Sequence, residues 1–365
     1  MSRNKLIPID NKNILSKIWL QEERMHHPRF KGNHYEMGQK MGNIFKKNNV
    51  QFPIKLDPFQ TEFGKESGIL LKQYFPEAAA EIKGITDVIE YDNELFTSWM
   101  MCMGCCHTID DGNCVEVRGC TAFSFVHSGQ VYHGRDNDLP PFLKNISKSI
   151  YYKPENKLSF ILNTSSFING EEGINEAGLV VAMTFVLPKL DEIKPGINSV
   201  FLVRYILENC KTVDEGIEVL QKLPIASSCN IILTDKKGNM VVMECNPIKI
   251  NIRKPETNNN GENFIITVNH FISKEMWKHD ASNRNVYFSE ERYQTAFNAL
   301  ENIDYIDGVE HAKNILSGRH GFMCQYDKAL NFETVWSSVF DITNNKVYRA
   351  EGNPLNTKYI EDKRL

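Results

Sequence analysis

The chain has 365 residues, of which 41% are hydrophobic and 24% charged, so it is long enough for one large domain or two ordinary ones around a substantial core. Its formal net charge of −4 gives no basic footprint for nucleic acid, so no nucleic-acid partner is expected. No apolar run approaches the roughly 18 residues of a membrane span, and the opening stretch has no apolar signal-peptide core, so we expect a cytoplasmic protein without membrane association.

The first third of the chain is predicted to be mainly helical. Residues 33–48 form one candidate helix, although Gly38 and Gly42 either weaken it or allow a close neighbour. Residues 75–90 form another, because Pro76 suits a first helical turn and apolar residues follow at helical spacing. This part of the chain carries no recognisable catalytic group, yet it is too apolar to be a disordered tail.

Cysteines and one histidine then gather in the sequence and raise the alternative of a zinc site. The cluster contains a CxxC motif and comprises Cys102, Cys105, Cys106, His107, Cys114 and Cys120. No second CxxC follows at the distance typical of zinc fingers, and residues 94–104 form an apolar run that indicates a buried helix with cysteine as core. We therefore expect no metal. The odd total of nine cysteines and the lack of a secretion signal disfavour disulfides.

Residues 119–138, GCTAFSFVHSGQVYHGRDND, predict a β-hairpin. Side chains alternate after Cys120, a serine and a glycine indicate a turn, and an extended pattern then resumes. Arg135 and Asp138 follow where the second strand ends, and an arginine beside a thiol favours the thiolate. Taken alone, Cys120 is more typical of a buried core residue, and the two charged residues are more typical of a surface ion pair.

The rest of the chain is predicted to contain strands with helical insertions. Strand patterns lie in residues 157–165, 173–186, 228–245 and 264–271. Helical patterns lie in residues 198–223, which indicate two consecutive helices, and in residues 289–303. No linker or repeat divides the chain, and periodicity alone indicates only a mixed α and β fold.

The sequence is similar to one enzyme family in five segments. These are FKGNHYEMGQKMGN, RGCTAFSF with HGRDNDLP, GINEAGLVVAMTF, TVNHF and TVWSSVFDITNNKVYRAEGNP. They resemble the autoproteolytic isopenicillin N acyltransferase (acyl-coenzyme A:6-aminopenicillanic acid acyltransferase) family and, more distantly, bile salt hydrolases, penicillin V acylases and acid ceramidase. The likeness runs from about residue 30 to residue 354. It implies an α+β fold of the N-terminal nucleophile (Ntn) hydrolase type, a four-layer αββα sandwich.

The resemblance also assigns roles to six residues. It makes Cys120 the nucleophile, Arg135 and Asp138 its charged neighbours, Asn269 in VNHF the side-chain donor of the oxyanion hole, Arg292 in SEERY a second site arginine, and Thr184 the equivalent of an asparagine in many relatives. At the Thr184 position the relatives use the backbone N–H, which threonine retains. Two alternatives stay open, Asn269 as a strand cap and Arg292 as a solvated helical residue.

A further implication of the resemblance is that the chain cuts itself between Gly119 and Cys120. The thiol would attack the preceding carbonyl, which glycine leaves accessible. The new N-terminal cysteine would carry a nucleophile and a base, since an α-amine has a pKa of about 8. Residues 1–119 would remain as a small subunit packed on the catalytic chain of residues 120–365, so the chain's own N-terminal fragment is an expected partner.

The expected function is hydrolysis of a linear amide or acyl thioester, or acyl transfer from it, through an acyl-Cys120 intermediate. The substrate would be a small molecule, the chemistry needs no cofactor, and the sequence is compatible with a homo-oligomer. Two alternatives stay open: an acyltransferase of natural-product biosynthesis, and a binding protein that retains the fold without cleaving. Five aromatic residues are candidates for an apolar pocket, although core positions are more typical of them: Phe123, Phe125, Phe185, Phe271 and Trp277.

Overall fold

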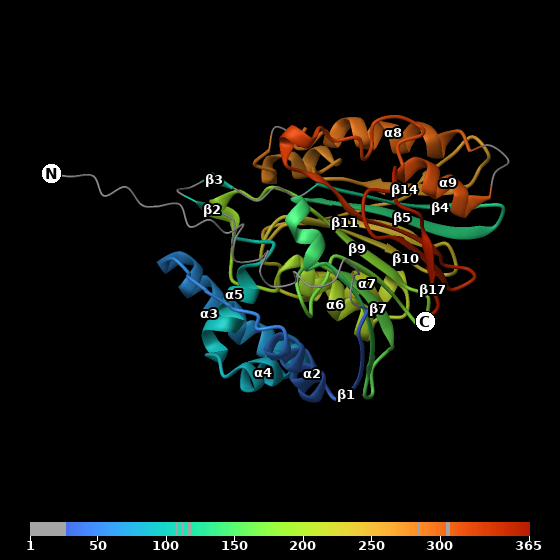
Figure 1. The fold of residues 1–365 in the computed structure, drawn as a ribbon. Coiled ribbons are helices and arrows are strands. Elements are labelled where there is room, and N and C mark those ends of the chain that lie inside the picture. The colour runs from blue at the N-terminus through green and yellow to red at the C-terminus, as the bar shows by residue number, and fades with distance from the viewer. Residues whose placement is uncertain (1–26, 107–108, 111–112, 115–118, 283–284, 304–306) are drawn as a thin grey trace.

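The structure is a computed structural model that describes residues 27–106, 109–110, 113–114, 119–282, 285–303 and 307–365. Two large sheets lie face to face, and helices cover their outer faces (Figure 1). Within these ranges no helix is long and apolar enough to cross a bilayer.

The first sheet has eight strands, and its first strand comes from the N-terminal part of the chain. The strand order is β1 (Arg29–Gly32), β6 (Lys148–Pro154), β7 (Phe160–Thr164), β8 (Glu172–Asn175), β9 (Val180–Phe185), β10 (Cys229–Thr234), β11 (Met240–Cys245) and β12 (Ile250–Arg253). Strand β1 pairs in parallel with β6, whereas the other neighbours are antiparallel. Chain segments from before and after Cys120 therefore share one sheet.

The second sheet has seven strands and carries the predicted hairpin at its centre. The strand order is β13 (Glu256–Thr257), β14 (Asn263–Thr267), β4 (Gly119–His127), β5 (Gln130–Leu139), β15 (Glu333–Asp341), β16 (Lys346–Ala350) and β17 (Ile360–Asp362). Strands β4 and β14 pack on β9 and β11 of the first sheet. A short separate ribbon consists of β2 (Ile109–Asp110) and β3 (Asn113–Cys114).

Helices cover the outer face of each sheet. Helices α6 (Ser199–Asn209) and α7 (Val213–Lys222) pack on the eight-stranded sheet, and α8 (Ser289–Glu301) and α9 (Gly308–Leu316) pack on the seven-stranded sheet (Figure 1). Side-chain caps begin α6 at Asn198 and α7 at Thr212, as the consecutive helical patterns predicted. The layers confirm the predicted four-layer αββα arrangement.

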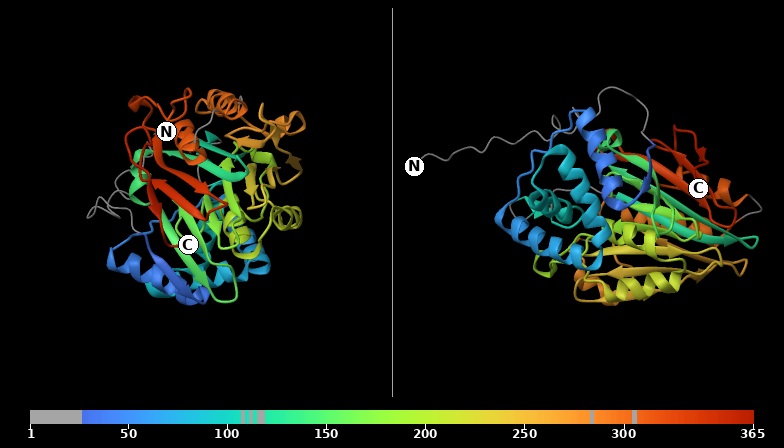
Figure 2. Two further views of the ribbon diagram at one scale, coloured as in Figure 1. Left: turned by 90° about the vertical axis from the view of Figure 1, so that its right-hand side faces the viewer. Right: turned by 90° about the horizontal axis from the view of Figure 1, so that it is seen from below.

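Among the described residues before the hairpin, four helices gather beside α6 at one end of the sandwich (Figure 2). They are α2 (His34–Lys47), α3 (Pro58–Tyr74), α4 (Pro76–Ile89) and α5 (Asn93–Cys102). A Cβ on Gly38 would lie 2.0 Å from the Glu81 carbonyl oxygen, and one on Gly84 would lie 2.1 Å from the Tyr35 carbonyl oxygen. These glycines therefore allow α2 and α4 to approach each other closely, which decides between the two predictions made for Gly38.

The β4–β5 hairpin fixes which side chains share a face. Ser128 and Gly129 form its two-residue turn with φ of 52° and 72°, a conformation typical of tight hairpins. This turn pairs Cys120 directly with Asn137. Since directly opposed side chains lie on the same face of a sheet, both point into the space between the two sheets.

Candidate active site

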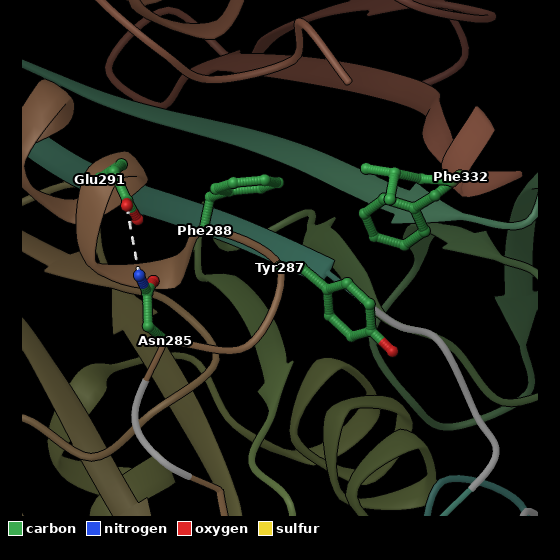
Figure 3. A pocket seen from close by; sticks show the side chains of 6 residues that line it. Asn285, Tyr287, Phe288, Glu291 and Phe332 are labelled. Atoms are coloured by element: carbon green, nitrogen blue, oxygen red, sulfur yellow. Dashed lines mark hydrogen bonds between the residues drawn. The ribbon is translucent and has the colours of Figure 1, made fainter. Parts of the chain in front are cut away.

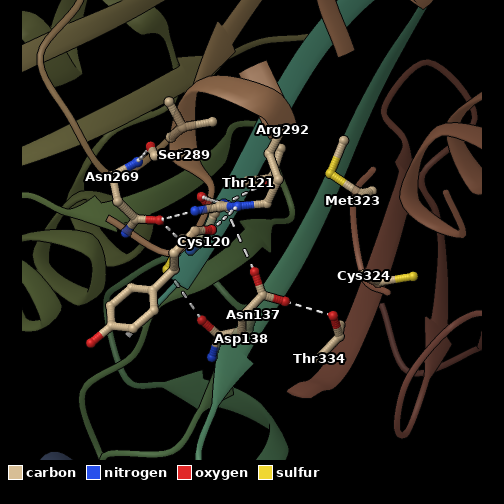
Figure 4. A network of polar contacts seen from close by, with 12 residues as sticks. Cys120, Thr121, Asn137, Asp138, Asn269, Ser289, Arg292, Met323, Cys324 and Thr334 are labelled. Carbon is tan, nitrogen blue, oxygen red and sulfur yellow. Dashed lines mark hydrogen bonds and ion pairs between the residues drawn. The ribbon is translucent and has the colours of Figure 1, made fainter. Parts of the chain in front are cut away.

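The Cys120 thiol lies buried between the two sheets, with an exposed fraction of 2%. Its sulfur is 3.4 Å from Nη2 of Arg135. The sulfur also lies 3.4 Å from Oδ1 of Asn137 (Figure 4). Nη2 of Arg135 also donates to Oδ1 of Asn137 at 3.2 Å. The structure thus brings the predicted arginine to the thiol and adds an asparagine that the sequence interpretation did not single out.

A buried ion pair fixes the orientation of Arg135. Its Nε lies 2.8 Å from Oε2 of Glu172, and its Nη1 donates to the carbonyl oxygen of Met183. Oε1 of Glu172 in turn accepts from Nδ2 of Asn163 at 2.5 Å and from the Trp336 indole at 3.1 Å. A buried charge needs such partners, and here they leave one edge of the guanidinium directed at the sulfur.

The backbone of Cys120 has its own contacts. Its N–H donates to Oδ1 of Asn269 at 2.6 Å, and its carbonyl oxygen accepts from Nη1 of Arg292 at 2.5 Å. Nη2 of Arg292 donates to the same Asn269 oxygen at 2.8 Å. The remaining guanidinium nitrogen, Nε, donates to the Tyr287 carbonyl at 3.1 Å. Residues distant in sequence therefore hold both polar groups of the cysteine backbone.

The position of Arg292 excludes the alternative that the sequence left open for this residue. A solvated position on the helix was the alternative for this residue, but the structure buries it completely. It lies in the first turn of α8, and every side-chain nitrogen has an acceptor in Cys120, Thr121, Asn269 or Tyr287. These hydrogen bonds offset the cost of burying the charge.

Asp138 lies on the opposite face of β5 from the thiol. Arg135 and Asp138 are three residues apart on one strand, so strand alternation directs them to different faces. The Asp138 carboxylate accepts from Thr334 at 2.6 Å and from the Tyr326 hydroxyl at 2.9 Å, and it lies 3.8 Å from Nη1 of Arg292. Because Asp138 pairs with Gly119 in the strand register, its side chain lies beside the Gly119–Cys120 peptide rather than beside the sulfur.

Gly119 is required for space. A Cβ at this position would lie 2.7 Å from Cζ of Phe332 and 3.0 Å from Cβ of Asp138. Gly119 lies in the extended strand β4 and is not among the glycines with positive φ. Close packing of two side chains on the peptide, rather than an unusual backbone conformation, therefore accounts for glycine before Cys120.

The Thr184 hydroxyl makes hydrogen bonds with residues other than Cys120. Its hydroxyl donates to the Val268 carbonyl at 2.6 Å and accepts from Nδ2 of Asn230 at 3.2 Å. The backbone N–H of the next residue, Phe185, lowers the pKa of the Cys120 thiol, against the larger effect of burial. This region therefore offers a backbone donor to the site, although the donor belongs to the residue after Thr184.

Burial dominates the electrostatics of the site. It raises the pKa of the Cys120 thiol, and the Arg135 guanidinium opposes that increase. Burial likewise raises the pKa of the Asp138 carboxyl, with Arg292 opposing. The thiol is therefore mainly protonated near neutrality in the continuous chain, so a base is needed before it can attack.

The described cysteines before the hairpin belong to no group that could hold a metal ion. Cys102, Cys105 and Cys106 are buried in and after α5, where cysteine packs as an apolar residue as predicted. Among the described residues no group of three or more His, Cys, Asp or Glu side chains could hold a metal ion. His107 and the side chain of Cys114 lie outside that description.

An aromatic pocket of about 290 Å³ includes Phe332, the ring that packs against Gly119, in its wall (Figure 3). It is lined by Asn285, Tyr287, Phe288, Glu291, Leu330 and Phe332. Tyr287 stacks on Phe332 with 4.7 Å between the ring centroids, and the Phe332 ring packs against Gly119. Tyr287 and Phe288 both have positive φ, which is rare for bulky residues and is often found at functional sites.

The aromatic residues that line this pocket differ from those the sequence suggested. Phe123 and Phe125 belong to the core beneath α8 and α9, and Phe185 and Phe271 belong to other buried clusters. Trp277 is 36% exposed and donates to the Ile272 carbonyl. The core interpretation therefore holds for the four phenylalanines.

The family model for acyl-coenzyme A:6-aminopenicillanic acid acyl-transferase matches residues 126–356, more than half of the chain. The chain belongs to this family. Membership confirms the predicted resemblance to this family.

Three solved structures are also similar to this chain. Penicillin V acylase from Agrobacterium tumefaciens is 17% identical with a TM-score of 0.44, and the match covers 67% of this chain and 87% of that chain. An N-acylethanolamine-hydrolyzing acid amidase ortholog from Caenorhabditis elegans is 20% identical with a TM-score of 0.44, and the match covers 61% of this chain and 93% of that chain. A mutant of conjugated bile acid hydrolase from Clostridium perfringens is 14% identical with a TM-score of 0.43, and the match covers 67% of this chain and 93% of that chain.

Proposed function

We propose that this family member is a self-cleaving cysteine amidohydrolase or acyltransferase whose mature nucleophile is Cys120. The observation that carries the proposal is the convergence of three side chains on one residue. Arg135 contacts the sulfur, Asn269 contacts the backbone nitrogen and Arg292 contacts the carbonyl oxygen. A core cysteine needs none of these contacts, whereas a residue that must become both nucleophile and N-terminus uses all of them.

Self-cleavage would proceed in two balanced steps. The Cys120 thiolate attacks the Gly119 carbonyl carbon, an S–C bond forms, the C–N bond breaks, and the released nitrogen takes a proton to become the α-amine. Water then hydrolyses the Gly119 thioester, which gives a Gly119 carboxylate and a free thiol. The Asp138 carboxylate beside this peptide would hold the new ammonium group, and Oδ1 of Asn269 would accept a hydrogen bond from one of its N–H groups.

Turnover would repeat this chemistry on a substrate. The α-amine takes the thiol proton, the sulfur attacks the substrate carbonyl, and the amine or thiol leaving group departs with a proton as acyl-Cys120 forms. Water as acceptor gives hydrolysis, which we propose as the main reaction, and an amine acceptor gives acyl transfer. The pocket walled by Tyr287, Phe288 and Phe332 favours an apolar acyl group.

Acylation of the purified protein tests this function directly. A panel of acyl amides and acyl thioesters is incubated with the protein, and peptide mass spectrometry locates the acyl group. We expect it on Cys120. Cys210 offers a matched buried thiol for comparison, since its exposed fraction is 1%. An acyl group on other cysteines alone, or none with any substrate, would contradict the proposal.

Asn269 allows a prediction about amine positioning. Its oxygen accepts from Cys120 N–H, while its Nδ2 donates to the Phe185 carbonyl at 2.9 Å and so does not point at an oxyanion. Asn269→Ala is expected to lower kcat by about 10² or more, because the amine loses its orientation as a base. Asn269→Asp keeps the oxygen and should retain most of the turnover.

Measuring kcat, KM and melting temperature on the same preparations separates the alternatives for Asn269. A strand cap would behave differently, with stability lowered by about 1 kcal/mol and kcat of the folded fraction unchanged. Equal losses in the Ala and Asp variants would instead return Asn269 to the predicted role of oxyanion donor.

A buried ionic network would keep the two fragments together after cleavage. Nη2 of Arg204 on α6 lies 2.7 Å from Glu81 on α4, and its Nε contacts Glu208. Nε2 of His34 on α2 lies 2.9 Å from Glu208, and the Tyr152 hydroxyl donates to Glu81 at 3.1 Å. His34 and Glu81 would belong to the small fragment and the other three residues to the large one.

Arg204→Met is therefore expected to loosen the association of the fragments. The change leaves two buried carboxylates without their cation and should cost about 3 to 5 kcal/mol. Size-exclusion chromatography at increasing urea concentrations measures the midpoint at which the small fragment dissociates. This midpoint should lie at a lower urea concentration than in the wild type. Lys222→Met removes one partner of an exposed ion pair with Glu218 and should leave that midpoint unchanged. Equal midpoints for both variants would contradict the role of the network.

A further inference from the structure

Asn137 carries a buried hydrogen-bond donor that has no partner among the described residues. Around Cys120 the side-chain nitrogens of Arg135, Asn269 and Arg292 all have hydrogen-bond or ion-pair partners. Nδ2 of Asn137 has none within the described part of the chain, although the residue is only 1% exposed. Leaving a buried amide donor unsatisfied costs stability, so its retention next to the nucleophile needs an explanation.

The orientation of the Asn137 carboxamide is fixed by its oxygen. Oδ1 accepts from Nη2 of Arg135 at 3.2 Å and lies 3.4 Å from the Cys120 sulfur. Exchanging the two ends of the amide would place N–H groups against the Arg135 guanidinium, which has only donors. The ion pair between Arg135 and Glu172 holds the arginine in place, so Oδ1 faces the sulfur, and Nδ2 at the other end of the same carboxamide has no partner among the described residues.

We infer that Asn137 is a catalytic residue whose Nδ2 donates a hydrogen bond to the carbonyl oxygen of the acyl group that the Cys120 sulfur attacks. The inference rests on the proposed function. As the S–C bond forms, the carbonyl electron pair moves onto oxygen, and a fixed donor stabilises that negative charge more than it stabilises the neutral carbonyl. Asn137 transfers no proton, because the α-amine receives the thiol proton. The Asn269 amide already donates to the Phe185 carbonyl.

Two substitutions of Asn137 separate its donor from its acceptor. Asn137→Asp keeps an oxygen for Arg135 and loses the donor, and Asn137→Leu loses both. The probe is the hexanoyl thioester of N-acetylcysteamine, and intact-mass spectrometry follows single-turnover acylation of Cys120. Both variants should acylate about 10² to 10³ times more slowly than the wild type at saturating probe, with little change in the half-saturating probe concentration.

The pH dependence of acylation distinguishes donor loss from the added charge of Asn137→Asp. A negative charge next to the sulfur shifts the rate profile to higher pH and leaves its plateau unchanged, whereas donor loss lowers the plateau. Asn175→Asp is the matched control. That buried asparagine on β8 donates to the Leu207 and Cys210 carbonyls, so its change should lower the melting temperature and leave the acylation plateau unchanged.

The outcomes are distinct. A wild-type plateau in Asn137→Asp, or losses in both variants that match the fraction unfolded, would overturn the role of Asn137 while the proposed function stands. Absence of acyl-Cys120 in the wild-type protein would instead overturn the proposed function itself. Lowered plateaus in both variants at a near-wild-type melting temperature would support Asn137 as the donor.

Discussion

Cys120→Ala is expected to abolish both self-cleavage and turnover. Both reactions need a sulfur that attacks a carbonyl, and alanine has no nucleophile. The variant should fold, because it removes one small buried atom from a site where Arg135 keeps its bonds to Glu172 and Asn137. Denaturing gel electrophoresis should show one full-length band of 42.0 kDa, and acyl-amide hydrolysis should fall to the background rate.

Cys210→Ala is the control for this experiment. It removes another buried thiol, at the end of α6, and should leave cleavage and turnover unchanged. Cys120→Ser retains a weaker nucleophile and should cleave slowly if at all. A Cys120→Ala chain that still divides at the same position would exclude Cys120 as the nucleophile of self-cleavage.

Asp138→Asn is expected to lower turnover by orders of magnitude while the protein stays folded. The carboxylate lies beside the Gly119–Cys120 peptide and accepts from Thr334 and Tyr326, so an amide of the same size can occupy the position. The amide cannot supply the negative charge that would hold the new ammonium group. Steady-state kinetics and circular dichroism on one preparation measure the two effects.

Asp136→Asn is a matched control on the same strand face. Burial and the neighbouring Asp138 raise the pKa of the Asp136 carboxyl well above its usual value. The raised pKa favours the neutral acid at this position, which is the form that an amide resembles. Turnover should stay near that of the wild type. Near-normal turnover in Asp138→Asn, or an equal loss in both variants, would show that Asp138 does not act through its charge.

The hairpin illustrates what sequence pattern can predict. Alternation and the Ser128-Gly129 turn predicted both strands, and a two-residue turn also fixes the register that pairs Cys120 with Asn137. The same alternation separates Arg135 from Asp138 onto opposite faces. Asn137 and the placement of Asp138 were therefore implicit in the sequence, although the interpretation treated both charged residues as neighbours of the thiol.

The remaining contacts depend on tertiary structure. Asn269 follows β14 and Arg292 lies in the first turn of α8, and both reach Cys120 only because the seven-stranded sheet packs beneath that helix. No local pattern predicts which helical arginine is buried; that assignment came from the family resemblance. The aromatic wall around Gly119 was missed because Tyr287 and Phe332 lie in loops, where spacing gives no signal.

Sequencing the N-terminus of the large fragment tests the central claim most directly. The account predicts two bands for the purified wild-type protein, of about 14 and 28 kDa when 42.0 kDa is divided at Cys120 in proportion to length. Edman degradation of the larger band should give Cys-Thr-Ala-Phe. A single full-length band, or a large fragment that begins at any other residue, would contradict Cys120 as the N-terminal nucleophile.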